Sequence, residues 1–189
     1  MEEKNLDDVN FSHGHHVEED FSGANLAGAK FYNATLVRAN FTDAEIAGAH
    51  FMDARLARAI FTGAKLAGAD FTGANLVGAN FTGANLSGAN FTKSNLSGAT
   101  LPKANLSGAI LAKANLAGAD FTDADLFGGD LSDANFAGAN LKNADFSKAN
   151  LVRAKLMGAS LKKTNFMDAN VVGANFAGTD LKNALNLKK

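Results

Sequence analysis

The chain of 189 residues contains no cysteine and no tryptophan, and it has a single proline, Pro102, and a single tyrosine, Tyr32. The lack of cysteine excludes disulfide bonds, thiolate metal ligands and cysteine nucleophiles. The formal net charge is −1, so no overall field draws the molecule to nucleic acid or to anionic lipid. No apolar run reaches the length of a membrane span, and the acidic N-terminus lacks the apolar core of a signal peptide. We therefore expect a soluble, cytoplasmic protein.

A strict period of five runs through the sequence. Every fifth residue from Phe21 to Leu181 is Phe, Leu, Ile or Val, over 33 consecutive positions that we call the centres. The residue two before the centre is Ala in 28 units, and the residue directly before it is Asn in 15 and Asp in seven. Neither a helix, with a period of about 3.6, nor a strand, with a period of about 2, repeats in this way. The pattern predicts a repeat architecture.

A chain that turns a corner in every unit keeps all its centres pointing inward. We expect very short extended sides, tight turns at the corners, and coils that stack at about 4.8 Å with hydrogen bonds between them. Gly stands two residues after the centre in 17 units, which is typical of the positive-φ position of a type II turn. The corners with Asp, Asn, Lys or Arg at this position are predicted to use a different turn. Pro102, directly after a centre, fits a turn position with φ near about −65°.

Units such as Ala24–Gly28 (ANLAG) and Ala84–Gly88 (ANLSG) resemble the pentapeptide-repeat family, whose consensus is A(D/N)LXX. The resemblance covers residues 19–183. It implies an all-β fold, a right-handed quadrilateral β-helix (β-solenoid) with about 20 residues per coil and about eight to nine coils. The centres form the predicted core, represented by Phe21, Leu26, Phe31, Leu36, Phe81, Leu86, Phe91, Leu96, Leu106, Phe136 and Phe146.

The pattern weakens at both ends of the array. Residues 1–18 are predicted to be an N-terminal cap with degenerate repeats, because His16 stands where a centre is expected. Residues 19–183 form the β-helix, and residues 184–189 a C-terminal cap or tail. The segment that begins at Asp180 could form one helical turn. An incompletely capped coil exposes unpaired backbone, so it would favour an end-to-end homodimer.

Two groups of exposed residues are candidate partner surfaces. Arg38, Arg55 and Arg58 share one face, which is either a solubilising face or a site for a small anion or an acidic partner. The second group surrounds Phe127, which follows a centre and should be exposed. Its carboxylates either form ion pairs with Lys and Arg one coil away or help Phe127 to bind a partner; they are Asp120, Asp123, Asp125, Asp130 and Asp133.

Other polar clusters favour structural interpretations. His13, His15 and His16 precede three acidic residues, a combination that could bind a transition metal, but nothing in the spacing fixes their geometry. The repeated Asn before the centres could suggest ligand binding, yet Asn also bonds to backbone at turns and stacks into ladders. We find no catalytic motif, and a filled rod lacks the pocket that catalysis needs. We therefore predict no catalytic residues, no metal, no cofactor and no enzymatic activity.

The architecture favours a rigid scaffold for protein–protein interaction, because each coil contacts only its neighbours and the exterior is free to vary. We expect a protein partner, with no direct binding to nucleic acid or membrane. The family resemblance implies one alternative, a DNA mimic that binds DNA gyrase. The sequence departs from that type in its balanced charge, its basic rather than acidic face, and its short basic C-terminus.

Overall fold

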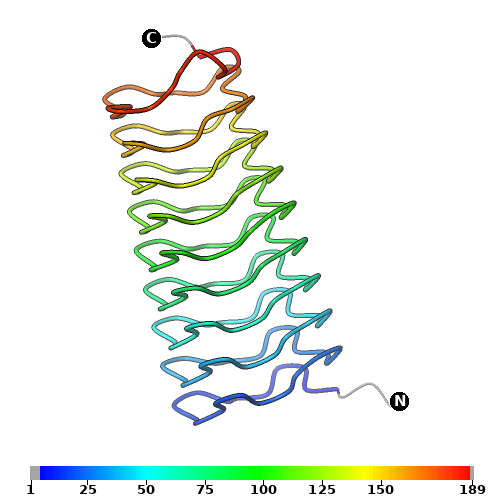
Figure 1. Cartoon of the computed structure of the whole chain (residues 1–189). Coiled ribbons are helices and arrows are strands. Elements are labelled where there is room, and N and C mark those ends of the chain that lie inside the picture. Colours follow the sequence, from blue (N-terminus) through cyan, green and yellow to red (C-terminus); the bar gives the residue numbers. More distant parts are fainter. Residues whose placement is uncertain (1–4, 188–189) are drawn as a thin grey trace.

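Residues 5–187, which the computed structural model describes, wind into a rod of stacked coils (Figure 1). Every β-bridge is parallel and joins residues 20 positions apart, from Asn5↔Asn25 to Asn165↔Leu185. Four units therefore make one coil, and residues 5–187 make about nine coils, a length of roughly 40 Å at the usual strand spacing. Within residues 5–187 there is no helix and no strand longer than a single bridged residue. The fold is the predicted right-handed quadrilateral β-helix.

Each unit centred on residues 31 to 156 contributes three backbone hydrogen bonds between coils and one within its own turn. In the unit around Leu86, the amides of Leu86 and Gly88 donate to carbonyl groups 19 residues later, at 2.7 and 2.9 Å. The amide of Asn85 donates in the opposite direction, to a carbonyl 21 residues earlier, at 2.9 Å. The amide of Ala89 closes the turn on the carbonyl of Leu86 at 3.0 Å. The backbone is thus paired without any long strand.

The corners share one turn. The residue two after the centre has positive φ in every unit from residue 8 to residue 178, and the next amide donates to the carbonyl of the centre, which is the pattern of a type II turn. The prediction that non-glycine corners use a different turn is wrong: φ is 58° at Arg38 and 61° at Lys93, against 65° at Gly83. Bonds to both neighbouring coils hold these corners in a conformation that the side chain disfavours. Pro102 occupies the second position of its turn, where its fixed φ fits.

The interior consists of the centres and the Ala residues two positions before them. All eleven core residues named from the sequence are at most 1% exposed. A side chain larger than Ala has little room beside a centre. Ser94 and Thr164 replace this Ala and are also buried, each with its hydroxyl group donating to a backbone carbonyl, at 2.8 and 2.7 Å.

Phenylalanine forms two ladders in the N-terminal half of the rod. Rings 20 residues apart stack nearly parallel, as in Phe61–Phe81 with centroids 4.7 Å apart. The two ladders meet edge to face, as in Phe61–Phe71 at 5.8 Å. Both geometries are favourable for aromatic pairs, by about 0.5–1.5 kcal/mol each. Like therefore packs on like along the axis.

The ends differ from the predicted division. Residues 5–18 pair with the second coil in the regular register, with His15↔Thr35 as one of the bridges, so the array begins earlier than residue 19. His16 occupies an inward centre, and Gly14 replaces the usual Ala because a Cβ there would lie 2.2 Å from His16 Nε2. At the other end, residues 180–187 form no helix; Ala184 closes a hydrogen-bonded turn on Leu181 in which Asn183 lacks the positive φ of the other corners. The remaining parts of the predicted caps, 1–4 and 188–189, lie outside the described residues.

Candidate interaction surfaces

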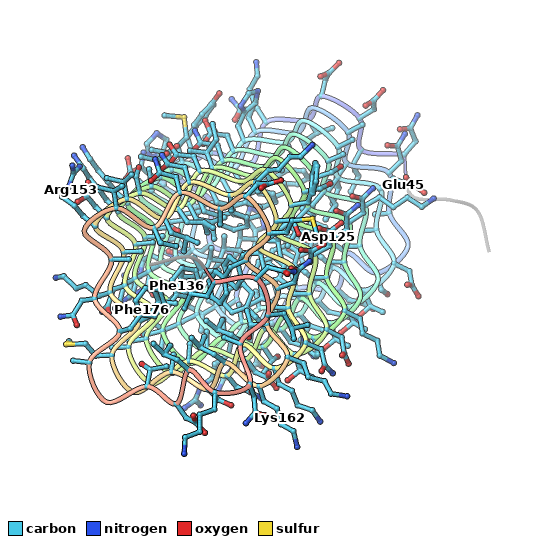
Figure 2. All side chains as sticks on the ribbon, turned by 90° about the horizontal axis from the view of Figure 1, so that it is seen from above. Glu45, Asp125, Phe136, Arg153, Lys162 and Phe176 are labelled. Atoms are coloured by element: carbon cyan, nitrogen blue, oxygen red, sulfur yellow. The ribbon has the colours of Figure 1, made fainter. Side chains whose placement is uncertain are left out.

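The long sides of the rod carry the polar and charged side chains and a few exposed hydrophobic ones, while the centres point to the axis. Figure 2 looks along the rod and shows Phe136 and Phe176 inside the coil, with Glu45, Arg153 and Lys162 directed outward. Any recognition along the sides must therefore use the turn residues and the bridged residues. Within residues 5–187 no group of three or more His, Asp and Glu side chains is placed to hold a metal ion.

Asn and Asp before the centres have a structural task. The Oδ1 atom of Asn80 accepts a hydrogen bond from the amide of Thr82 at 3.0 Å. This amide donates to no backbone carbonyl of the described residues. The same side chains also link coils: Asn115 Nδ2 donates to Asn95 Oδ1 at 3.1 Å. Where the bridged residue is Thr100, the residue two positions later is Pro102, which has no amide to satisfy. These side chains therefore complete the turn and the ladder.

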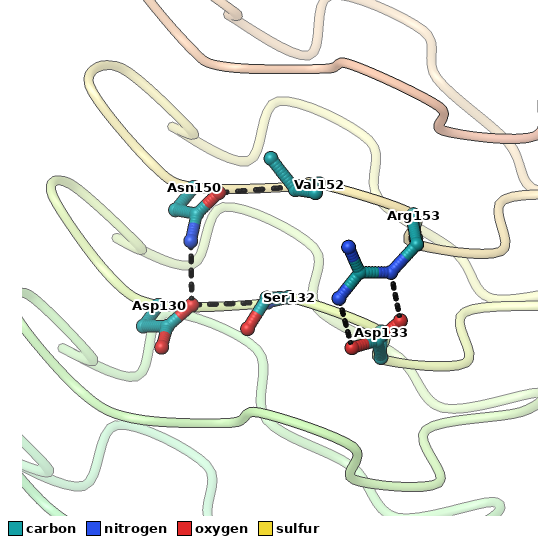
Figure 3. Close-up of polar contacts among 6 residues, drawn as sticks. All are labelled: Asp130, Ser132, Asp133, Asn150, Val152 and Arg153. Atoms are coloured by element: carbon teal, nitrogen blue, oxygen red, sulfur yellow. Dashed lines mark hydrogen bonds and ion pairs between the residues drawn. The ribbon is translucent and has the colours of Figure 1, made fainter.

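The acidic cluster is largely committed to this ladder. Figure 3 shows Asp130 accepting the amide of Ser132 at 3.1 Å and Asn150 Nδ2 at 2.9 Å. Asp120 accepts the amide and hydroxyl of the residue two positions later and an Asn one coil above, and Asp125 accepts the amide of Phe127 at 2.9 Å. Asp123 accepts a hydrogen bond from Asn143 Nδ2, one coil above, at 2.7 Å, rather than forming the ion pair expected with a Lys or Arg.

Asp133 forms the strongest ion pair of the cluster. Arg153, one coil above, donates from Nε at 2.7 Å and from Nη2 at 2.8 Å to the two carboxylate oxygens (Figure 3). This bidentate hydrogen bonding holds the pKa of Asp133 below its ordinary value, and nearby Lys113 and Lys155 act in the same direction. The pairing of Asp133 with Arg153 along the rod agrees with the structural interpretation of this residue.

Phe127 is the exposed aromatic side chain that the sequence predicts. It is 42% exposed, and its backbone is fixed by hydrogen bonds of its amide to Asp125 and its carbonyl to Gly108. The ammonium group of Lys148 lies 5.4 Å from the ring centroid, a cation–π distance. Asp125 and Asp130 are the bridged residues on either side of it in the chain. The rod thus presents an aromatic ring between two carboxylates on a rigid corner.

The arginine face is less free than the sequence indicates. Arg38 pairs with Glu18, one coil below, with Nη2 and Oε1 2.5 Å apart. Arg55 is exposed, and Arg58 extends along Gly78 of the next coil. The histidine segment behaves similarly: His16 Nδ1 lies 2.5 Å from Glu19 Oε2, while His13 and His15 are exposed.

Sequence reasoning missed the apolar side chains near the C-terminal end. Met157, Met167 and Val172 follow centres, where most units have a small or polar residue, and they are exposed. A cavity of about 630 Å³ lies at this end of the rod, lined among others by Val171, Val172 and Phe176. A hydrophobic residue directly after a centre is the sequence signal that could have found them.

Comparison with known protein families agrees with this repeat architecture. The family description of pentapeptide repeats, in eight copies, matches residues 5–43, 49–88, 89–128, 124–162 and 159–187. The chain belongs to the pentapeptide-repeat family. No curated protein matches it.

Solved structures of other pentapeptide-repeat proteins share this fold. HetL, involved in heterocyst differentiation regulation in the cyanobacterium Nostoc sp. strain PCC 7120, is 27% identical over 98% of this chain and 92% of its own, with a TM-score of 0.65. Trypsin-treated QnrB1, a plasmid-mediated fluoroquinolone resistance protein, is 15% identical over 93% of this chain and 90% of its own, with a TM-score of 0.67. At this identity the likeness to QnrB1 shows the fold alone. Residues 5–187 of the present pentapeptide-repeat protein include no helix that could cross a bilayer.

Proposed function

We propose that this pentapeptide-repeat protein is a non-enzymatic scaffold whose rigid side binds a protein partner. The filled interior supports the proposal: centres and Ala side chains occupy the axis of the rod, so recognition on the sides takes place on a surface rather than in a pocket. Surface recognition on a solenoid suits a macromolecular partner better than a small substrate. The described polar clusters are also engaged in turns and ladders rather than arranged around a reacting group.

The surface around Phe127 is the best candidate for the contact. An aromatic side chain on a backbone held at both sides can bind without first losing much conformational freedom, and such residues contribute strongly to protein interfaces. Lys148 already places a cation over the ring. Each neighbouring Asp uses its Oδ1 atom in the ladder. We infer a partner that brings a basic or hydrophobic side chain to the ring and replaces Lys148.

The proposal is tested by affinity capture from lysate of the source cells with the wild-type chain and Phe127→Ser. Val77→Ser is a matched control, because Val77 also follows a centre and is 37% exposed. We expect a protein that wild type and Val77→Ser retain and Phe127→Ser loses. Equal capture by Phe127→Ser would contradict this surface. Retention that depends instead on Arg38 and Arg58, tested by Ala variants, would move the contact to the arginine face.

The second candidate function is DNA mimicry directed at DNA gyrase, the alternative that the resemblance to the pentapeptide-repeat family implies. The charge distribution weighs against it, because the net charge is only −1 and a mimic of DNA needs a strongly negative surface. A gyrase supercoiling assay with and without a quinolone separates the two functions. Inhibition or protection at micromolar protein supports mimicry; no effect supports the scaffold.

A further inference from the structure

The C-terminal coil presents an unpaired apolar edge. Its centres Val171, Phe176 and Leu181 are only half-buried, unlike the centres of the middle coils, and Val172 is 71% exposed. These side chains line the cavity at this end of the rod. Within residues 5–187, the amides of Val171 and Phe176 have no backbone acceptor. The edge is therefore an open template for a further coil.

The N-terminal coil presents the complementary edge. In the units centred on residues 6 to 156, the centre donates its amide to the carbonyl of a bridged residue in the following coil. In the first coil the corresponding carbonyl groups, on Asn5, Asn10 and His15, accept no backbone hydrogen bond from residues 5–187. The centres Leu6 and Phe11 are half-buried. Free donors at the C-terminal end thus point outward along the axis of the rod, and free acceptors at the N-terminal end point outward in the opposite direction, so the two ends can pair.

The helical rise selects one way to join the two edges. Because the chain is helical, the position along the rod axis rises steadily from residue 168 to residue 187 at the C-terminal edge. At the N-terminal edge it rises in the same way from residue 5. The two edges fit without a gap when the start of the N-terminal coil of the second copy, at residue 5, lies on the start of the C-terminal coil of the first. Asn5 of a second copy then lies on Asn170, Leu6 on Val171 and Phe11 on Phe176. This repeats the bridge and the ring stacking found inside the rod.

Charge supports the same arrangement. Residues 5–24 carry five acidic residues and no Lys or Arg, whereas residues 148–167 carry five basic residues and no acid. The acidic set is Asp7, Asp8, Glu18, Glu19 and Asp20, and the basic set is Lys148, Arg153, Lys155, Lys162 and Lys163. In the matched register the coil 168–187, which carries Asp168, Asp180 and Lys182, separates the two sets. The distance between the sets is roughly 10 Å, which is within the screening length at low salt. Glu18 of the second copy lies over the corner that carries Lys162, Lys163 and Lys182.

We propose that copies of this protein associate head to tail, the N-terminal coil of one continuing the C-terminal coil of the next with Asn5 on Asn170. The contact is heterologous, so each added copy leaves the same two edges free and the product is a dimer or a longer rod rather than a closed ring. Tail-to-tail association would instead bring the basic coils of both copies together.

Cysteine cross-linking tests the register, and the chain has no cysteine of its own. The proposal places Asp7 of one copy on Val172 of the other, and stacked positions about 4.8 Å apart lie within the range for a disulfide. We expect a disulfide-linked dimer when Asp7→Cys and Val172→Cys are mixed under mild oxidation. Neither variant alone should form it. A chain with both substitutions should give a ladder of oligomers.

Val17→Cys mixed with Val172→Cys is the matched control, because Val17 is also exposed on the N-terminal coil but would lie over Lys182 on another corner. Cross-linking of this pair as efficient as that of the Asp7 pair would overturn the register. Cross-linking of Val172→Cys with itself would show tail-to-tail association. A monomer by sedimentation equilibrium at all concentrations would overturn the proposal itself.

Sedimentation of uncross-linked protein tests the charge argument. Association should weaken as salt rises, and Lys163→Glu/Lys182→Glu should lower the association constant by about tenfold at low salt. Lys93→Glu, in the middle of the rod, is the control and should have no such effect. An equal effect of both changes, or stronger association at high salt, would contradict a charge-assisted head-to-tail contact.

Discussion

Single residues at the corners carry strain that the sequence pattern conceals. Glycine, asparagine and charged side chains share the same corner position, and from residue 8 to residue 178 this position always has a left-handed φ. A side chain in this region is disfavoured by about 1–2 kcal/mol relative to the ordinary conformation, and glycine is not. The coil imposes the turn, and the residue type only changes its stability.

Lys93→Gly should therefore stabilise the protein, by about 0.5–1 kcal/mol after the entropy of glycine in the unfolded chain is subtracted. Gly83→Ala is the converse change at another exposed corner, where an added Cβ meets nothing within 4 Å. It should destabilise by about 1 kcal/mol through φ alone. Urea unfolding of both variants measures the difference. Destabilisation by Lys93→Gly would mean that contacts of the Lys93 side chain outweigh the strain.

The Asp133–Arg153 ion pair should make the pKa of Asp133 sensitive to the loss of Arg153. Because the Arg153 hydrogen bonds lower the pKa of Asp133 in the folded protein, the pair stabilises the fold above the unfolded pKa. That contribution is lost as the pH falls through the lowered, folded pKa. Arg153→Ala should raise the pKa of Asp133, as measured by NMR titration of its carboxyl carbon. Arg58→Ala, on another corner, should leave the pKa of Asp133 unchanged. A shift of this pKa in Arg58→Ala would instead indicate a general effect of the charge of the protein.

At the scale of the coil, the period of five was enough to predict the inward centres, the small Ala beside them and the corner positions. The inward orientation of Leu86 and Phe81, for example, was predicted from the sequence alone. The equality of the corners could not be predicted, because local preference at Arg38 or Lys93 favours another turn and only the bonds to both neighbouring coils override it. Phe127 was found as an exception to the pattern. The hydrogen bonds of Asp120 and Asp130 within their turns and to the next coil could not be predicted, because they depend on distances between side chains that only the structure gives.

Leu106→Asp tests the coil directly. Leu106 is completely buried, and an unpaired carboxylate there would have to lose its hydration or disrupt two coil interfaces, at a cost of several kcal/mol. We expect no soluble folded protein, judged by expression and circular dichroism. Asn85→Ala removes one turn hydrogen bond, to the amide of Ser87, and should destabilise by only about 1 kcal/mol. Near-wild-type melting of Leu106→Asp would refute the inward assignment.

The whole molecule is a one-dimensional stack with unequal ends. A middle coil is bonded and packed on two sides, whereas the coil at 168–187 is bonded on one side only, and its centres are partly exposed. In such a stack, stability is close to a sum over neighbouring interfaces, so opening starts where an interface is missing. The open C-terminal edge therefore sets both the local stability of the rod and its capacity to accept another copy.

Hydrogen exchange should reveal this gradient. At low concentration, the amides of Val171 and Phe176 should exchange at nearly unprotected rates, and those of Phe71 and Leu86 at least about a hundredfold more slowly. As concentration rises, stacking of a second copy should protect Val171 and Phe176, because each gains an acceptor, while the middle coils stay unchanged. Uniform protection along the rod at low concentration would mean that it opens only as a whole. Protection that stays absent at high concentration would mean that the edge remains open and that copies do not continue one another's coils.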